Sequence, residues 1–415
     1  MKILCNRKVL SGEVDLVRSK SIANRLLIIQ ALADFSFGIK NNSNAEDSQT
    51  LTAILNSLRD KSRDTEDYVL DVGPAGTCFR FLTAYLTIQK GTFVLTGSER
   101  MKQRPIGPLV DALRSIDADI HYLEKEGYPP LKIKGRELSS EAKIVIDASI
   151  SSQFVSALIM LAPCLNGGLS ITLEGKISSR PYLEMTLTLM RKFGIGASFE
   201  GNEIRIQNGT YTGMDLEVEA DWSGASYFYG LVALATESNL LLKGLQLDSI
   251  QGDSKIADLF REIGVDSIQE DAGVRIRSKG HKPSGIWSID FSEIPDTAQT
   301  FAVVLALMGQ EANFTGLESL RIKETDRIKA LQVELAKINW GLESNDDIHF
   351  HLKPIGTGIK DKPVIETYED HRMAMSFALL GLRMETDILE PDVVGKSFPD
   401  YWKILEQLGF SYQNE

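Results

Sequence analysis

Residues 151–162 read SSQFVSALIMLA, a small polar cluster followed by an apolar run of helical length. Five other segments have the same design, so that copies begin at residues 19, 76, 151, 223, 296 and 369. The other five read SKSIANRLLIIQALA (19–33), GTCFRFLTAYLT (76–87), SGASYFYGLVALA (223–235), DTAQTFAVVLALM (296–308) and EDHRMAMSFALLGL (369–382). Their spacing of roughly 57 to 75 residues exceeds the period of about 20 to 50 residues found in solenoid repeats. The chain therefore contains six copies of a larger unit.

A second helical segment follows each of these runs and is more amphipathic, with apolar residues three and four positions apart. These segments read DSQTLTAILNSL (47–58), RPIGPLVDALRSI (104–116), RPYLEMTLTLMRKFG (180–194), SKIADLFREIG (254–264), TDRIKALQVELAKI (325–338) and PDYWKILEQLG (399–409). Short alternating stretches between the helices, such as TFVLTG (92–97) and LSITLEG (169–175), predict strands. The repeated unit is therefore strand, helix, strand, helix and then further strands.

The two kinds of helix predict how each unit packs. The first helix is apolar on nearly every face and is expected to be buried, whereas the second covers a sheet with one face. Six such units are too many for one core in 415 residues, so an α/β fold with two domains of three units each is the natural grouping. One long doubly wound sheet is the alternative that periodicity leaves open.

Composition and charge exclude several classes of protein. With 25% charged and 43% hydrophobic residues the chain has an ordinary globular profile, and its net charge of −12 opposes non-specific binding to nucleic acid. Cys5, Cys78 and Cys164 form no disulfide framework, which favours a reducing compartment. The sequence MKILCNRKVL has no apolar signal-peptide core, and the apolar run Phe301–Met308 is too short to span a membrane. We expect a cytoplasmic protein.

Polar residues suited to anion binding gather at helix starts, where backbone N–H groups and the helix dipole favour negative charge. Lys20, Ser21 and Arg25 at the first of these starts predict a phosphate cradle, the alternative being a capped helix with solvated cations. Similar residues recur at Gly76 with Arg80, at Arg104 before a proline expected in the first helical position, at Ser151–Gln153, at Asp370–Arg372 and at Lys396.

The densest of these clusters is LRIKETDRIKAL (320–331). Glu324 and Arg327 are three positions apart and can pair on one helix face, so a solvated, salt-bridged helix start is one interpretation. That interpretation does not explain why cations recur at the other helix starts. A cationic anion site formed by several helix starts is the competing hypothesis.

Two carboxylates, Asp296 and Glu324, stand apart from the cations. A carboxylate among Lys and Arg has a depressed pKa and can serve as a base, whereas burial raises its pKa. For Asp296 the competing interpretation is a helix N-cap. A metal site is not expected, because His349 and His351 lack further ligands at metal-binding spacing. The sequence also lacks the GxSxG, Walker A and GxGxxG motifs.

In their order along the chain, these clusters resemble the EPSP synthases (3-phosphoshikimate 1-carboxyvinyltransferases) of the enolpyruvyl transferase family. The matching pieces are SKSIANR (19–25), AGTCFR (75–80), GSERMKQRPIGPLVDALR (97–114), SSQFVSALIM (151–160), SSRPYLEMTL (178–187), ADWSGASYF (220–228), IPDTAQT (294–300), LRIKETDR (320–327), YEDHRMAM (368–375) and KSFPDYW (396–402). The resemblance implies two domains of three βαβαββ units each, one spanning residues 19–218 and the other residues 1–18 plus 219–415. It places the active site in the cleft between the domains, which are expected to close on the ligands.

The resemblance also implies the reaction and the role of each residue. The enolpyruvyl group of phosphoenolpyruvate would pass to the 5-hydroxyl of shikimate 3-phosphate with release of phosphate, a step of the shikimate pathway toward chorismate and the aromatic amino acids. Asp296 would be the base for the hydroxyl, and Glu324 with Lys20 would handle the proton at C3. Shikimate 3-phosphate would contact Lys20, Ser21, Arg25, Ser151, Ser152, Gln153, Ser179, Tyr182, Asp296, Ser319 and Lys323. Phosphoenolpyruvate would contact Lys20, Gly76, Arg104, Gln153, Arg327, Arg372 and Lys396. No metal or organic cofactor, no nucleic-acid partner and no membrane are implied, and a monomer is expected.

Three positions depart from the family pattern. Arg18 stands where Pro-Gly or a similar small pair is usual, Pro74 stands where Asn is common, and Ser319 stands where some members have Asn. The departures affect loop geometry and leave the charged residues in place. One rival is the related transferase that acts on UDP-N-acetylglucosamine, in which Lys-Asn replaces Lys20-Ser21 and a loop cysteine acts as an acid. The other rival is a non-catalytic anion-binding homologue, which the presence of both Asp296 and Glu324 disfavours.

Overall fold

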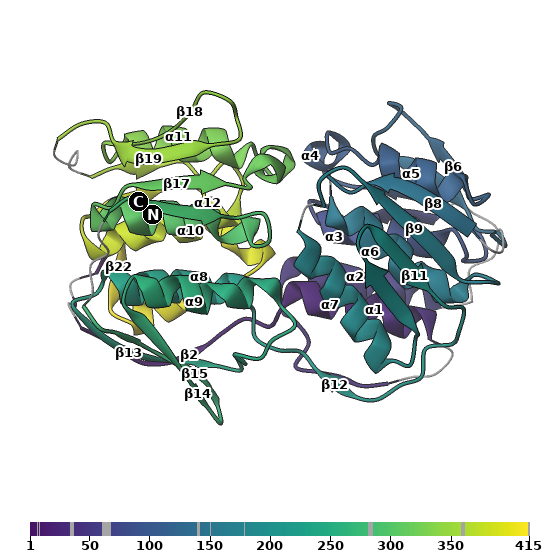
Figure 1. The fold of residues 1–415 in the computed structure, drawn as a ribbon, viewed down its shortest axis with the longest axis horizontal. Helices are drawn as coiled ribbons and strands as arrows, with labels where there is room; N and C mark the ends of the chain where they lie inside the picture. The colour runs from purple at the N-terminus through teal and green to yellow at the C-terminus, as the bar shows by residue number, and fades with distance from the viewer. Residues whose placement is uncertain are drawn as a thin grey trace. The chain divides into compact units, whose positions relative to one another are not determined.

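The chain folds into two units in a computed structural model that describes residues 1–5, 7, 9–33, 37–59, 68–138, 142–149, 151–177, 179–280, 285–357 and 362–413. Ser19–Val218 forms one unit, and Met1–Arg18 with Glu219–Glu415 forms the other. We call these the inserted unit and the split unit, because the first interrupts the sequence of the second. Each is an assembly of small sheets and helices (Figure 1).

Five four-stranded sheets in the described residues share one topology, in which a parallel pair is extended by two antiparallel strands. In the inserted unit they are β4 (Tyr68–Asp71), β5 (Thr92–Thr96), β7 (Leu131–Lys134) and β6 (Asp119–Tyr122), then β10 (Ala197–Glu200), β11 (Glu203–Ile206), β9 (Leu169–Glu174) and β8 (Ala142–Asp147). A further parallel pair joins β3 (Ile39–Lys40) to β12 (Leu216–Glu217). Because parallel neighbours require a crossover connection, each four-stranded sheet is the strand part of one predicted unit.

The split unit holds the other three four-stranded sheets. Their strands, in sheet order, are β14 (Val265–Glu270), β15 (Gly273–Ser278), β13 (Glu237–Lys243) and β2 (Val9–Asp15); β16 (Trp287–Asp290), β17 (Ala312–Thr315), β19 (Phe350–Pro354) and β18 (Trp340–Ser344); and β20 (Val364–Ile365), β21 (Thr386–Ile388), β1 (Lys2–Cys5) and β22 (Phe410–Gln413). The N-terminal strands β1 and β2 thus complete sheets whose other strands follow the inserted unit. Separate sheets rule out the single long doubly wound sheet.

The first helix of each repeat is buried, as predicted. These helices are α1 (Lys20–Leu32), α3 (Gly76–Leu86), α6 (Ser152–Leu161), α8 (Trp222–Leu234), α10 (Ala298–Met308) and α12 (His371–Phe377). Every residue from Ala298 to Ala306 of α10 is buried, and α3 is buried except at Thr77. Hydroxyls join three of them in the split unit: Thr300 lies 3.2 Å from Ser226 and 3.3 Å from Ser376, measured between oxygens.

The second helices carry the amphipathic sequences, and most of them contact strands of the sheets. They are α2 (Glu46–Arg59), α5 (Gly107–Arg114), α7 (Arg180–Lys192), α9 (Ile256–Glu262), α11 (Arg327–Ala336) and α13 (Tyr401–Gln407). Figure 1 shows α8 and α9 along one side of the sheet that contains β13 and β15. The remaining turns are the short helix α4 (Glu99–Lys102) and the 3-10 helices η1 (Ala162–Cys164), η2 (Gly252–Lys255), η3 (Pro295–Thr297), η4 (Glu318–Ile322), η5 (Ala378–Leu382) and η6 (Pro391–Lys396).

Two predicted helix starts are wrong by a few residues. Asp296 lies in η3, and Thr297 is the N-cap of α10, so Asp296 is not a helix cap. α5 begins at Gly107 rather than at Pro105, since Pro108 takes the early helical position. In both cases a tight turn precedes the helix, which leaves Asp296 and Arg104 on the turn.

No helix within the described residues is long and apolar enough to cross a membrane.

Candidate active site

Arg327 is the centre of a buried charge network in the split unit. It is the first residue of α11, is 1% exposed, and donates to three carboxylates. Its Nε lies 2.6 Å from Asp370, Nη1 lies 2.9 Å from Asp296, and Nη2 lies 2.9 Å from Glu324. The predicted pair of Glu324 with Arg327 is present, but the interpretation of it as a solvated pair is wrong, because the guanidinium is enclosed. Three negative neighbours raise the pKa of Arg327 against the effect of burial and keep it charged.

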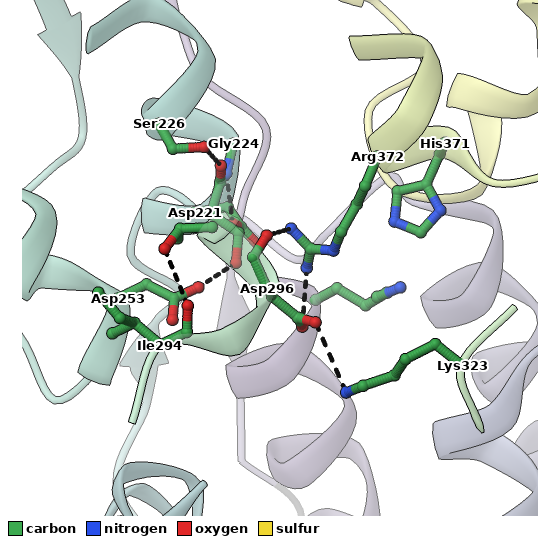
Figure 2. Close-up of polar contacts among 12 residues, drawn as sticks. Asp221, Gly224, Ser226, Asp253, Ile294, Asp296, Lys323, His371 and Arg372 are labelled. Atoms are coloured by element: carbon green, nitrogen blue, oxygen red, sulfur yellow. Dashed lines mark hydrogen bonds and ion pairs between the residues drawn. The ribbon is translucent and has the colours of Figure 1, made fainter. Parts of the chain in front are cut away.

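Asp296 lies on the turn before α10 and contacts three cations, of which Arg372 and Lys323 are labelled beside it in Figure 2. Arg372 donates to its backbone oxygen and to Oδ2, both at 3.0 Å, while Lys323 Nζ lies 3.5 Å from Oδ1, the oxygen that also accepts from Arg327. Burial raises the pKa of Asp296, but the positive charges of Arg372, Lys323 and Arg327 outweigh it and hold this pKa well below its usual range. The carboxylate is ionised and fully engaged.

Glu324 lies between two cations of the same network. Its Oε2 accepts from Arg327, and its Oε1 lies 2.8 Å from Nζ of Lys396, the last residue of η6. Asp370 completes the arrangement: it caps α12 by accepting from the backbone N–H of Arg372 at 2.9 Å, besides binding Arg327. His371 follows it and is buried, with Nδ1 3.9 Å from Asp370. The predicted residues Asp296, Lys323, Glu324, Arg327, Arg372 and Lys396 therefore form one connected cluster.

In the described part of the chain, Ser319 takes no part in the hydrogen bonds and ion pairs that join this cluster. It lies half-buried in η4, the turn that leads to Lys323.

The inserted unit holds a second buried arginine, Arg25 of α1. Its guanidinium donates to Thr186 Oγ1 (2.7 Å), Ser156 Oγ (3.1 Å) and the backbone oxygens of Ser21 (2.9 Å) and Tyr182 (3.3 Å). All these partners are neutral. Burial lowers the pKa of Arg25 to about 10, which still leaves it charged at neutral pH. A buried cation with neutral partners favours an external anion.

Arg104 and Gly76 lie against each other. A Cβ atom added to Gly76 would lie 2.5 Å from Nη1 of Arg104, so only glycine leaves room for this guanidinium at the N-terminus of α3. Arg104 is 8% exposed, and within the described residues its Nε has no hydrogen-bond partner. Arg80 supports the loop from behind by donating to the oxygens of Gly76 (3.2 Å) and Pro105 (3.1 Å). Such an underused, buried guanidinium is suited to a carboxylate or phosphate.

The other predicted residues of the inserted unit also occupy helix starts. Lys20 Nζ pairs with Asp47 at 2.9 Å, and Ser151 caps α6 by accepting from the N–H of Gln153. Gln153 in turn donates to Thr77 at the start of α3, at 3.1 Å. Ser152 is the first residue of α6, Tyr182 lies in the first turn of α7, and Ser179 precedes α7 in the left-handed region with φ of 56°. The remaining cradle residue, Ser21, lies in the first turn of α1.

A family model for EPSP synthase (3-phosphoshikimate 1-carboxyvinyltransferase) matches residues 5–405. The chain belongs to the EPSP synthase family. A 3-phosphoshikimate 1-carboxyvinyltransferase of Bacteroides fragilis (strain YCH46) is 43% identical over 406 residues, which cover 97% of this chain and 96% of that protein. One from Sulfurovum sp. (strain NBC37-1) is 37% identical over 423 residues, covering 97% of each chain.

A solved EPSP synthase structure from Acinetobacter baumannii has the same fold. It aligns with a TM-score of 0.77 and 22% identity, and the alignment covers 99% of this chain and 100% of that one. The family and fold predicted from the sequence are thereby confirmed.

The site prediction missed three buried acidic residues, Asp47, Asp253 and Asp370. Asp253 of η2 is 4% exposed and accepts a short hydrogen bond from Ser223, while its Oδ1 has no hydrogen-bond partner in the described part of the chain. Burial and the charge of Asp296 raise the pKa of Asp253 to about 7. Asp47 and Asp370 were missed as partners of Lys20 and Arg327. In the sequence, only their positions at helix starts could have indicated these roles, and helix capping explained those positions equally well.

Groups of three or more potential metal ligands are absent from the residues that the structure describes.

Proposed function

We propose that this chain is a 3-phosphoshikimate 1-carboxyvinyltransferase, which transfers the enolpyruvyl group of phosphoenolpyruvate to the 5-hydroxyl of shikimate 3-phosphate and releases phosphate. The observation that carries the proposal is the Asp296 carboxylate, bound by Arg327, Arg372 and Lys323 beside Glu324. Family membership supplies the substrates. The charged residues of the cluster would bind these substrates.

Binding is the first task of these residues, because the two substrates bring several negative charges. Arg104 has unused donor capacity, and Arg25 has only neutral partners, so both gain from an external anion. Phosphoenolpyruvate would bind to Arg104 and would also contact Gly76, Lys20, Gln153, Arg327, Arg372 and Lys396. Shikimate 3-phosphate would bind to Arg25 and would also contact Lys20, Ser21, Ser151, Ser152, Gln153, Ser179, Tyr182, Ser319, Lys323 and Asp296. Both units would thus act on the same pair of substrates.

Asp296 would be the base in the addition step. It takes the proton of the 5-hydroxyl while the oxygen bonds to C2 of phosphoenolpyruvate and C3 gains a proton. In the free chain its oxygens are held by Arg327 and Arg372, which keep its pKa low and make it a weak base. An anionic substrate that draws these guanidinium groups to itself frees the carboxylate and raises its pKa. The base would therefore strengthen when the substrates are in place.

Glu324 and Lys20 would handle the proton at C3. Glu324 lies between Arg327 and Lys396, two proposed phosphoenolpyruvate ligands, and this would bring a carboxyl group to the reacting anion. In the elimination step C3 loses a proton, the C2–O bond to phosphate breaks, and the enol ether double bond forms. Cations that stabilise the departing phosphate lower the barrier to this step.

Phosphate release from the full chain tests the proposal. We expect release with phosphoenolpyruvate plus shikimate 3-phosphate, and none with phosphoenolpyruvate plus UDP-N-acetylglucosamine. Asp296→Asn should lower kcat by roughly two to four orders of magnitude, the usual effect of losing a general base. Asp290→Asn is the matched control, because Asp290 is exposed and accepts hydrogen bonds from its near neighbour Ser292. Absence of release with shikimate 3-phosphate contradicts the assigned function.

A further inference from the structure

Glu334 is a fully buried carboxylate on α11 that does not belong to the charge network around Arg327. It lies seven residues after Arg327, two turns along the same helix, and therefore on the same face. Its exposure is 0%. A carboxyl group at such a depth is retained only where its oxygens have hydrogen-bond partners. The partners of Glu334 therefore indicate what it does.

Those partners tie α11 to the segment that leads into α12. Tyr368 donates its hydroxyl to Oε1 at 2.7 Å, and the backbone N–H of Glu366 donates to Oε2 at 3.2 Å. Lys337 binds both oxygens, at 2.9 and 2.7 Å, and also donates to the backbone oxygen of Val364 at 2.8 Å. Residues 364–368 are thus held to one helix at three points.

This segment has an unfavourable backbone that needs such support. Tyr368 and Glu369 have φ values of 56° and 55°, two successive non-glycine residues in the left-handed region. L-residues rarely adopt this conformation, and it persists only where surrounding contacts fix it. Next in the chain come Asp370, which binds Arg327, and Arg372, which binds Asp296. The turn therefore sets where both side chains lie.

We propose that Glu334 is a positioning residue for enolpyruvyl transfer: through Tyr368 and the backbone of Glu366 it fixes the entry to α12 and so the place of the Arg372 guanidinium. α11 then holds the segment twice, through Arg327 at Asp370 and through Glu334 at Tyr368. The hydrogen bonds of Glu334 within the described residues go to other groups than Asp296 and Arg372, so its effect passes through the backbone. The consequence for turnover rests on the proposed function, whereas the consequence for the position of the backbone does not.

Tyr368→Phe in the full chain is the principal test, because it removes one hydroxyl and keeps the ring and the Glu334–Lys337 ion pair. We expect KM for phosphoenolpyruvate to rise about tenfold, as for the loss of a hydrogen bond to a charged group, with KM for shikimate 3-phosphate within about twofold of its original value. Glu334→Gln, which keeps an acceptor oxygen for Tyr368, should change KM less than Glu334→Ala. Tyr412→Phe is the control, since its hydroxyl donates to Trp402 in the same unit at 2.7 Å.

Hydrogen exchange of the peptide that contains residues 366–373 gives a readout independent of turnover. The N–H groups of Asp370, Arg372 and Met373 are bonded within this turn, so Tyr368→Phe should speed their exchange and Tyr412→Phe should not. Equal KM values and equal exchange in the two variants overturn the inference, as does an equal rise in KM for both substrates. If the unmodified chain releases no phosphate, the proposed function fails, and exchange alone decides whether Glu334 fixes this segment.

Discussion

At the scale of single residues, the buried arginines are of two kinds. Arg327 is matched by three carboxylates of its own chain and serves to hold Asp296, Glu324 and Asp370 in place. Arg25 and Arg104 have no carboxylate partner among the contacts of the described residues. Removing one partner from a buried charge costs more than the pair contributes, so the three carboxylates keep Arg327 in place until an anionic substrate competes for it. The second kind is available to a ligand.

Gly76→Ala tests the Arg104 site directly. The new Cβ would lie 2.5 Å from Nη1 of Arg104, and the mobile end of the side chain can move away, so the fold should lose less than about 1 kcal/mol of stability. The displaced guanidinium should raise KM for phosphoenolpyruvate about tenfold or more. Gly107→Ala is the control, because its Cβ would meet ordinary contacts starting at 3.5 Å. Steady-state kinetics in which both variants match the unmodified chain would remove Arg104 from the site.

Asp253 predicts an unusual dependence of stability on pH. Its pKa is about 7 in the folded chain and 3.8 when unfolded, so between these values only the folded form keeps the proton. Its contribution to stability is complete below pH 4 and is lost as the pH rises through 7, by up to about 4 kcal/mol. Asp253→Asn cannot ionise and should therefore gain stability over the unmodified chain as the pH rises from 4 to 8.

Urea denaturation across this pH range measures that difference. Asp258→Asn on α9 is the control, since Asp258 is exposed and pairs with Arg261 at the surface. A stability difference that stays constant with pH would show that Asp253 is ionised in the folded chain.

The sequence could identify most charged residues of the cluster around Arg327, but of their pairs it indicated only that of Glu324 with Arg327. Lys323, Glu324 and Arg327 were found because they lie within one short motif. Asp253 was not found from the sequence. Its burial, and the absence of a described hydrogen-bond partner for its Oδ1, depend on the packing of η2 against α8. Glu334 was likewise interpreted as part of an amphipathic helix, since nothing in a single sequence reveals that Tyr368 reaches it.

At the scale of secondary structure, the buried helices of the split unit meet at small residues. Gly230 of α8 lies where α8 meets α10 and η5, and a Cβ there would lie 2.9 Å from both Val304 Cγ2 and Leu379 Cδ1. The apolar pattern predicted that these helices are buried. The apolar pattern could not show which residues touch. It also placed the start of α10 at Asp296 and therefore missed the turn that precedes this helix.

Gly230→Ala tests this close packing. Alanine favours a helix over glycine by about 1 kcal/mol, whereas overpacking a tight core costs about 1–3 kcal/mol. Because the added methyl group would press on two side chains from different elements, we expect a net loss in the free energy of unfolding, measured by chemical denaturation. A gain in stability would mean that α10 and η5 move apart without cost.

At the scale of the whole molecule, the proposed substrate ligands are divided between the two units. Lys20, Arg25 and Arg104 lie in the inserted unit, and Lys323, Arg327, Arg372 and Lys396 in the split unit. If all act on one pair of substrates, binding both substrates should draw the units together, a common way of excluding water during catalysis. Small-angle scattering should then show a smaller radius of gyration with both ligands than with either alone. An unchanged radius in the ternary complex contradicts this closure.

The insertion of one unit into the other also sets an order for folding on the ribosome. The inserted unit is continuous from Ser19 to Val218, and its β3–β12 pair can form once residue 217 has emerged. By contrast, β1 at residues 2–5 pairs with β21 at residues 386–388 and β22 at residues 410–413, which are made long after it. Domains fold as units during synthesis, and contacts between distant residues form late. β1 therefore waits unpaired while the inserted unit and most of the split unit are made, and its exposed edge is where misassembly of this protein would begin.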